Sequence, residues 1–186
     1  MTTPQQVWDT FRKMPENDMY DYSPFLRACA HGNVLEIGVC LGVSTAAFLL
    51  GLDSKNDGHL WSIDIDARCG ELFDHPKWTF IAGDSKTVTT EGLPEINVLF
   101  VDGDHSYASA SSDLKRFSEL VADDGIIMMH DVKPSEAWLP RIKAENWYPV
   151  EECSQAWQDF CNEHPSWWSW ILPGKTGLGV ISKREQ

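Results

Sequence analysis

The sequence predicts an α/β fold with one doubly wound, mostly parallel sheet of seven strands that ends in an antiparallel hairpin. Apolar runs without alternation, which are typical of strands buried on both faces, occur at 33–37, 60–64, 78–82, 96–101 and 126–129. Helix-like segments separate the first two runs and the last two, which is the rhythm of parallel strands joined by crossovers. The chain has 186 residues and is expected to form one domain over 1–186.

Residues 1–30 are predicted to form a helical cap ahead of the sheet. Val7 and Phe11 recur at helical spacing within 4–14, and Ser23 with Pro24 can cap and open a second helix over 22–30. We expect these helices to cover the edge of the sheet or the mouth of the active site, with simple packing as the alternative.

The stretch 33–45 carries a ligand-binding pattern. A strand runs into Gly38 and Gly42 and then into a helix, and ligands of open α/β sheets bind in the crevice beyond the carboxyl ends of the strands. Glu36 at the strand tip is expected to place an acid in that crevice. A dinucleotide fingerprint needs a glycine where Cys40 stands, so the pattern favours a ligand with a cationic centre, an ammonium and hydroxyls over a diphosphate.

The second and third strands also end in acids. Asp64 ends the second strand 22 positions beyond Gly42, where a carboxylate can accept hydrogen bonds from both hydroxyls of a ribose. Asp66 is a second candidate, although an acid at this place more often caps a helix. Asp84 and Ser85 follow the third strand and a glycine, and they can also cap the next helix.

Ionisable side chains gather at the ends of the fourth and fifth strands. Asp102 and His105 follow the fourth strand, and His130 and Asp131 follow the fifth. Ionisable groups in a crevice are costly unless they bind something. Because the two strands are expected to be neighbours, we predict that these four side chains converge.

The C-terminal part is predicted to hold a helix near 135–144, a short strand at 147–151 and a last strand at 177–182, the two strands forming the antiparallel hairpin. An aromatic-rich insertion over 152–176 lies between them and contains Trp157, Phe160, Trp167, Trp168 and Trp170. It is expected to form a substrate wall, a lid or the surface of a homodimer, with core packing as the alternative.

Composition restricts the partners. The formal net charge of −13 argues against a sequence-independent grip on nucleic acid and against a membrane partner, whereas a neutral or cationic small molecule meets less repulsion. The N-terminus lacks a signal sequence and no apolar run reaches the roughly 18 residues of a membrane span, so a cytoplasmic location is expected. The five cysteines form no Cys-x-x-Cys pair and are expected to be free thiols.

Taken in order, these motifs resemble class I S-adenosylmethionine (SAM) methyltransferases, most closely the branch that contains catechol O-methyltransferase and the small-molecule and sugar O-methyltransferases. The resemblance covers about 30–132 and the final Gly-Leu-Gly-Val-Ile. It implies a Rossmann-like sheet and SAM as the cofactor. The residues that it assigns to cofactor binding are Glu36, Gly38, Gly42, Ser44, Thr45, Asp64, Asp84, Ser85 and Asp102, with Asp84 and Ser85 beside the adenine.

The resemblance also implies a divalent metal at the tips of strands four and five. Carried over by motif, the metal ligands are Asp102, His130 and Asp131, with His130 acting directly or through the other ligands, and the general base is His105. Oxygen ligands favour Mg²⁺, and a histidine ligand would admit Mn²⁺. Such a metal would orient and acidify the acceptor hydroxyl for in-line transfer while a neutral imidazole takes its proton.

The expected function is therefore SAM-dependent methyl transfer to a hydroxyl of a sugar or phenol-like small molecule. Two alternatives stay open. A nicotinamide-dependent oxidoreductase is disfavoured by Cys40, and a non-catalytic SAM-binding module is disfavoured by the polar cluster at two strand tips.

Overall fold

The computed structural model describes residues 1–145 and 149–185, and within these ranges seven strands form one sheet in the order β3-β2-β1-β4-β5-β7-β6. Strands β1 to β5 pair in parallel, whereas β7 runs antiparallel to both β5 and β6. The predicted doubly wound sheet is confirmed. The strands are β1 (Asn33–Ile37), β2 (His59–Asp64), β3 (Trp78–Ala82), β4 (Ile96–Val101), β5 (Val121–Met129), β6 (Trp167–Leu172) and β7 (Leu178–Glu185).

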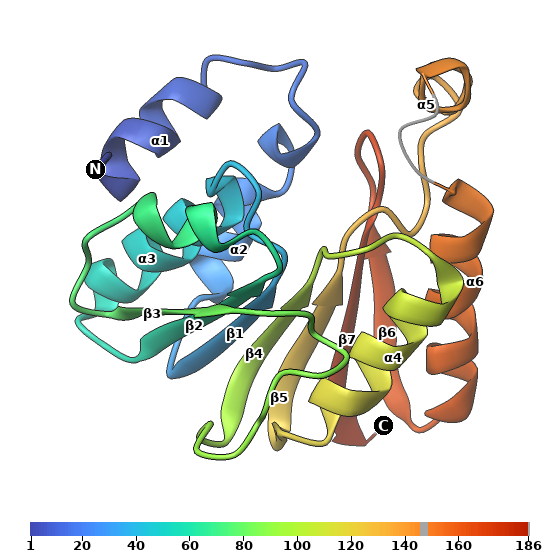
Figure 1. The fold of residues 1–186 in the computed structure, drawn as a ribbon. Coiled ribbons are helices and arrows are strands. Elements are labelled where there is room, and N and C mark those ends of the chain that lie inside the picture. Colours follow the sequence, from blue (N-terminus) through green and yellow to red (C-terminus); the bar gives the residue numbers. More distant parts are fainter. Residues whose placement is uncertain (146–148, 186) are drawn as a thin grey trace.

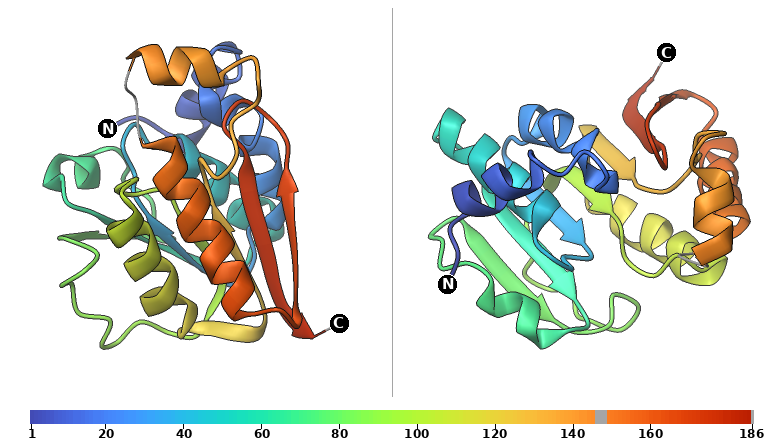
Figure 2. Two further views of the ribbon diagram at one scale, coloured as in Figure 1. Left: turned by 90° about the vertical axis from the view of Figure 1, so that its right-hand side faces the viewer. Right: turned by 90° about the horizontal axis from the view of Figure 1, so that it is seen from above.

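Helices cover both faces of the sheet, as Figures 1 and 2 show. One face carries the first three helices and the other carries α4 and α6. The helices are α1 (Pro4–Phe11), α2 (Ser23–Cys29), α3 (Val43–Lys55), α4 (Tyr107–Ser118), α5 (Leu139–Glu145) and α6 (Val150–Glu163), with 3-10 turns η1 (Asp18–Tyr20) and η2 (Ala67–Glu71). None of the helices in the described ranges is long and apolar enough to cross a membrane.

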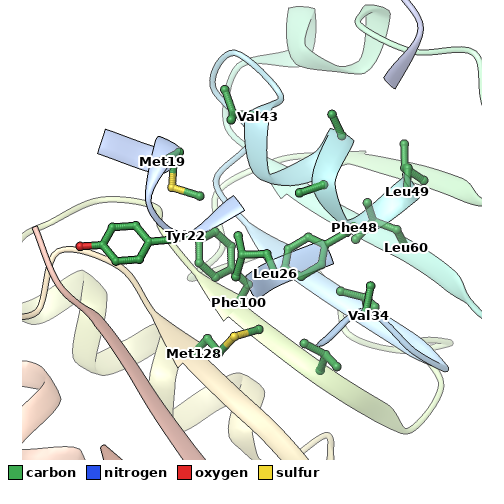
Figure 3. Close-up of a cluster of buried hydrophobic side chains, with 14 of the residues drawn as sticks. Met19, Tyr22, Leu26, Val34, Val43, Phe48, Leu49, Leu60, Phe100 and Met128 are labelled. Carbon is green, nitrogen blue, oxygen red and sulfur yellow. The ribbon is translucent and has the colours of Figure 1, made fainter. Parts of the chain in front are cut away.

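Two buried clusters explain why the strand sequences show no alternation. Residues such as Val34 and Phe100 face the first three helices, where Figure 3 shows them with Tyr22 and Phe48. Leu35 and its equivalents on the next strands face α4 and α6. Each central strand therefore buries both sets of side chains, which requires an apolar residue at nearly every position.

The N-terminal cap packs mainly on α3 rather than on an edge of the sheet. Both predicted helices are present but shorter than expected, and each of them contacts α3. Because α3 is thus enclosed between helices and sheet, nine of its 13 residues are buried. The chain between α1 and α2 bends over the strand tips, and its η1 turn lies beside the site described below.

Three expectations for the C-terminal half were wrong. Val150 and Glu151, placed in a strand at 147–151, open helix α6, while 146–148 lie outside the described residues. The expected insertion over 152–176 holds most of α6 and the whole of β6, so the sixth strand is built from the tryptophan-rich segment. The fifth strand, expected at 126–129, already begins at Val121, and its pairing with β4 shifts register between Val121 and Ile126.

Candidate active site

The carboxyl ends of four parallel strands meet at one edge of the sheet. Ile37 pairs with both Ile63 and Val101, and Val101 pairs with Met129. The hydrogen-bonded ladder continues one residue further, because the backbone N–H of Asp102 donates to the Ile37 carbonyl at 2.8 Å. The polar residues that follow each strand are therefore held side by side at this edge.

The turn after β1 is shaped by Gly38. Its φ is +93°, and a Cβ added there would lie 2.1 Å from the carbonyl oxygen of Asp102, so only glycine fits. The Asp64 carboxylate accepts hydrogen bonds from the backbone N–H groups of Val39 at 2.7 Å and Cys40 at 3.2 Å. Cys40 itself has a φ of +49°. Asp64 thus fixes the turn from the next strand and keeps lone pairs for a ligand in the adjoining cavity.

Glu36 does not lie in the crevice where the sequence placed it. Its side chain is fully buried beneath the turn, lines neither cavity described here, and accepts hydrogen bonds from Thr45 Oγ1 at 2.7 Å and Ser62 Oγ at 2.6 Å. Burial raises the pKa of Glu36 to about 7, and the hydroxyls of Ser44, Ser62 and Thr45 oppose that rise. Glu36 and Thr45, predicted as cofactor ligands, are instead hydrogen-bonded inside the fold, where Glu36 links β1 to α3 and β2.

The first cavity has a volume of about 450 Å³ and extends from the glycine turn to the end of β3. Asp64, Asp84, Ser85 and Asp102 line it, as predicted for a nucleoside site. The Asp84 carboxylate accepts from the backbone N–H of Lys86 at 2.9 Å and so closes a turn. The described chain has no helix between β3 and β4, so the expected helix-capping role of Asp84 and Ser85 was wrong. Asp66 instead caps η2.

A second cavity of about 180 Å³ adjoins the first and shares Gly38, Cys40, Asp102 and His105 with it. His130, Asp131 and Ser44 add further lining, and the η1 region closes it from outside. Gly42 lines neither cavity; with a φ of +74° it caps α3, and a Cβ there would approach the Phe73 ring within 2.9 Å.

The predicted convergence of Asp102, His105, His130 and Asp131 is what the structure shows. His105 Nε2 lies 2.8 Å from Asp131 Oδ2 and 3.6 Å from Asp102 Oδ1. His130 Nδ1 lies 3.2 Å from Asp102 Oδ1 and 3.4 Å from Asp131 Oδ2. Asp131 is held in the left-handed region with a φ of +63°, a conformation that side chains rarely adopt and that points to a functional constraint.

The two acids hold both imidazoles in the protonated form. Burial alone would lower the pKa of His105, but hydrogen bonds and charge from Asp102 and Asp131 raise it to about 10. The pKa of His130 is raised in the same way against its burial, and the pKa of Asp131 is held far below its usual range by the imidazoles in spite of burial. With both imidazoles protonated the cluster is close to neutral, and a divalent cation on the two carboxylates would take the place of imidazole protons.

Three of these side chains offer donor atoms for a metal. Each of Asp102, His105 and Asp131 offers one donor atom, and the three atoms lie within 4.8 Å of one another. Asp131 Oδ1 is also buried without a hydrogen-bond partner in the described structure. Oxygen and imidazole donors suit Mg²⁺ or Mn²⁺, so the residues present fit the implied ion. His105, predicted as the base, belongs to this donor set, whereas the predicted ligand His130 does not.

His130 is fixed from behind by a residue that the sequence did not reveal. Its Nε2 lies 2.9 Å from Thr176 Oγ1, and its ring meets the edge of Tyr22 at a centroid distance of 5.1 Å. The Tyr22 hydroxyl accepts hydrogen bonds from the backbone N–H groups of Thr176 at 3.1 Å and Gly177 at 2.6 Å. No motif surrounds Thr176, so its role could be found only from the fold.

The tryptophan-rich segment lies away from both cavities, so the expected substrate wall is not what it forms. Trp157 is buried in the core and packs against Gly179, which agrees with the core-packing alternative. Trp167 stacks on His164 at a centroid distance of 4.0 Å. Trp168 is exposed on β6.

Comparison with known proteins agrees with this architecture. No curated protein sequence matches the chain. A methyltransferase from Podospora anserina, solved with S-adenosylhomocysteine (SAH) bound, superposes with a TM-score of 0.72 at 17% identity, covering 98% of this chain and 88% of that one. A Staphylococcus aureus protein, provisionally described as a caffeoyl-CoA O-methyltransferase, gives 0.70 at 14% identity, with 99% and 93% covered. At these identities the similarity establishes the fold alone.

The family itself is established by sequence. The family model described as "Methyltransferase domain" matches residues 35–132, which is more than half of the chain and includes every strand tip of the site. This assignment favours a SAM donor over the nicotinamide alternative. The chain belongs to the methyltransferase domain family, and its sheet is that of a class I SAM-dependent methyltransferase.

Proposed function

We propose that this protein transfers the methyl group of SAM to a hydroxyl oxygen of a small molecule, a sugar or phenol-like compound, with the help of a divalent metal. The observation that supports this most directly is the cluster of two carboxylates and two imidazoles at the junction of the two cavities. A donor in one cavity and an acceptor in the other would meet beside Asp102 and His105, which line both. Transfer by in-line displacement requires such an alignment.

The first cavity supplies the groups for the nucleoside of SAM. Asp64 would hold the ribose hydroxyls while it continues to accept from the glycine turn. Asp84 and Ser85 would lie at the adenine edge. Ser44, in the first turn of α3, lines the second cavity, where the methionine part of the donor would approach the helix N-terminus.

Asp102 and Asp131 would hold the metal, and an imidazole would complete the protein ligands. A divalent cation bound there would supply positive charge that acidifies the acceptor hydroxyl and fixes its direction. His130 is only 2% exposed and faces Thr176 behind it, so it would orient the two carboxylates rather than contact the acceptor.

His105 would contact the acceptor. It lines both cavities and is the more exposed of the two imidazoles. As a base, His105 would have to be neutral, a state that positive charge bound to Asp102 and Asp131 would favour by lowering its pKa. It would then take the hydroxyl proton at Nε2, the atom now 2.8 Å from Asp131. As a third metal ligand it would instead leave proton removal to solvent. His105→Gln separates the two roles, because loss of a base lowers kcat with unchanged Mn²⁺ affinity, whereas loss of a ligand weakens Mn²⁺ binding.

The proposal is tested by measuring SAH formation with a panel of catechols and monosaccharides, with Mg²⁺ or with chelator. We expect activity in Mg²⁺ and its loss in chelator, and we expect Asp131→Asn to lose at least about 100-fold in kcat/KM. Asp123→Asn, an exposed acid within β5, removes the same charge away from the site and should retain activity. Equal turnover with and without chelator would exclude the metal. Binding of SAH without turnover of any acceptor would favour the non-catalytic alternative.

A further inference from the structure

Asp18 carries a negative charge into the second cavity from the N-terminal cap. It lies in the η1 turn, which Asn17 caps by accepting from the backbone N–H of Met19 at 3.0 Å, and all three residues line the cavity. The opposite wall is formed by the strand tips with Asp102 and Asp131. Asp18 is therefore the third carboxylate around this space, and it comes from a part of the chain that lies outside the family match at 35–132.

The positive charges that line this cavity, on His105 and His130, are already paired with Asp131 and Asp102. Among the described residues, none of those lining it is lysine or arginine. Apolar lining comes from Met19 of η1 and from Val39, Leu41 and Val43 at the glycine turn. A ligand that fills the space would meet an apolar wall, the strand-tip cluster and the Asp18 carboxylate.

Burial and neighbouring charges shift the pKa of Asp18 in the folded protein. Burial raises the pKa of Asp18, the nearby His130 lowers it, and Asp131 and Asp102 raise it further. The imidazoles of His105 and His130 offset the charges of Asp131 and Asp102, so the Asp18 carboxylate is the charge in this cavity that a ligand can balance. A divalent cation would neutralise Asp102 and Asp131 but would leave Asp18 to the molecule that occupies the cavity.

We propose that Asp18 is a specificity-determining residue that selects the methyl acceptor by charge. It would accept a hydrogen bond from a second hydroxyl or an ammonium of the acceptor, and it would disfavour acceptors that carry a carboxylate or phosphate near the reacting oxygen. The acceptor class is thus a neutral polyol or a cationic hydroxylated amine. This inference rests on the proposed function, because it assigns to the acceptor the part of the second cavity beside Asp18, away from the Ser44 end that the methionine of the donor would approach. The net charge of −13 acts in the same direction at longer range.

Three catechols that share the reacting pair of oxygens and differ in the charge of the ring substituent provide the test. Dopamine carries an ammonium, catechol is neutral and 3,4-dihydroxybenzoate carries a carboxylate, and each offers the same pair of vicinal oxygens. We would measure kcat/KM for each and, independently of turnover, the binding of each to protein saturated with SAH and Mg²⁺ by calorimetry. The wild-type protein should prefer dopamine and catechol to dihydroxybenzoate.

Asp18→Asn keeps the shape of the side chain and removes its charge. It also keeps an oxygen that can accept from the backbone N–H of Met19, which now donates to Asp18 Oδ1 at 2.8 Å. It should shrink the dopamine to dihydroxybenzoate ratio about tenfold, an effect typical of one charge pair at an intermediate dielectric. Affinity for SAH should not change. Asp123→Asn, with the same charge change on the far part of β5, should leave the ratio as in the wild type.

Each other outcome is decisive. An unchanged ratio in Asp18→Asn would overturn the inference, and so would failure of the wild type to bind any of the three compounds. A fall in SAH affinity would also overturn it, because Asp18 would then contact the methionine part of the donor. If wild-type protein binds the catechols in the expected order but forms no SAH, the proposed catalysis fails while the charge selection stands.

Discussion

Glu36 gives a sharp prediction because it is a fully buried carboxyl group with no cation beside it. The substitution is Glu36→Gln, which keeps the size and one acceptor oxygen for the hydroxyls of Thr45 and Ser62 and removes the ionisation. The Ser44 hydroxyl, which also interacts with the Glu36 carboxyl, can accept from the new amide as well as it can donate to a carboxylate. The comparison therefore isolates the cost of placing a charge beneath the turn.

The sign follows from proton uptake. The pKa of Glu36 rises from an ordinary 4.5 in the unfolded chain to about 7 in the fold. Between these values the folded protein holds a proton that the unfolded chain has lost, so the free energy of unfolding falls as the pH rises. Below 4.5 both states are protonated and the contribution is zero; above 7 both are ionised and the full cost applies. The difference between the two pKa values corresponds to about 3 kcal/mol.

The assay is urea unfolding of wild type and Glu36→Gln at pH 5 and pH 8. Because all other groups titrate alike in the two proteins, the free-energy difference between variant and wild type should shift by about 2 to 3 kcal/mol in favour of the variant at pH 8. Glu16→Gln, an exposed position, should show no comparable shift. A variant-minus-wild-type difference that is the same at both pH values would refute the account of Glu36 as a buried, uncompensated acid.

Three further substitutions test the rest of the site. Asp64→Asn should weaken SAH binding about tenfold or more in calorimetry, because a neutral amide is a poorer acceptor for ribose hydroxyls and for the turn. Gly38→Ala should lower the free energy of unfolding by more than about 2 kcal/mol, because its Cβ would collide with backbone. Its control is Gly92→Ala, at a φ of +89° with open space around it, which should lose only the cost of the backbone conformation, about 1 kcal/mol. Thr176→Val should weaken Mn²⁺ binding or kcat by about 10- to 100-fold by releasing His130, and Thr176→Ser should restore it; equal values for both variants would contradict the role of the hydroxyl.

The parallel part of the fold could be predicted because its signals are local. Each central strand is an apolar run of a few residues, and an acid or glycine marks its end; β3 and β4 have the predicted limits. The sixth strand was misplaced for a physical reason. Val150 to Glu163 carries apolar residues at helical spacing, but its first residues also fit a short strand, and the tryptophans of β6 suggested a surface rather than a sheet.

The site was predictable where a side chain follows a strand tip, and not where it depends on depth or on distant segments. Asp64, Asp102 and His105 line the cavities because the chain direction carries them there. Glu36 sits one residue before the end of β1, where the alternation of the strand turns its side chain down towards α3 and Ser62. Only a register argument applied to that strand would have placed it inside.

The two cavities differ in how they are built, and this divides the chemistry between parts of the chain. Every residue proposed for the donor or the metal lies within 36–131, inside the segment that matches the methyltransferase family at 35–132. The residues that close the second cavity from outside, Asn17 to Met19, and Thr176 behind His130 lie beyond that segment. On the proposed function, donor binding would be encoded by the shared sheet, while acceptor choice would depend on the N-terminal cap and the loop before β7. Substitutions in the cap should change which molecule is methylated and leave the affinity for the donor intact.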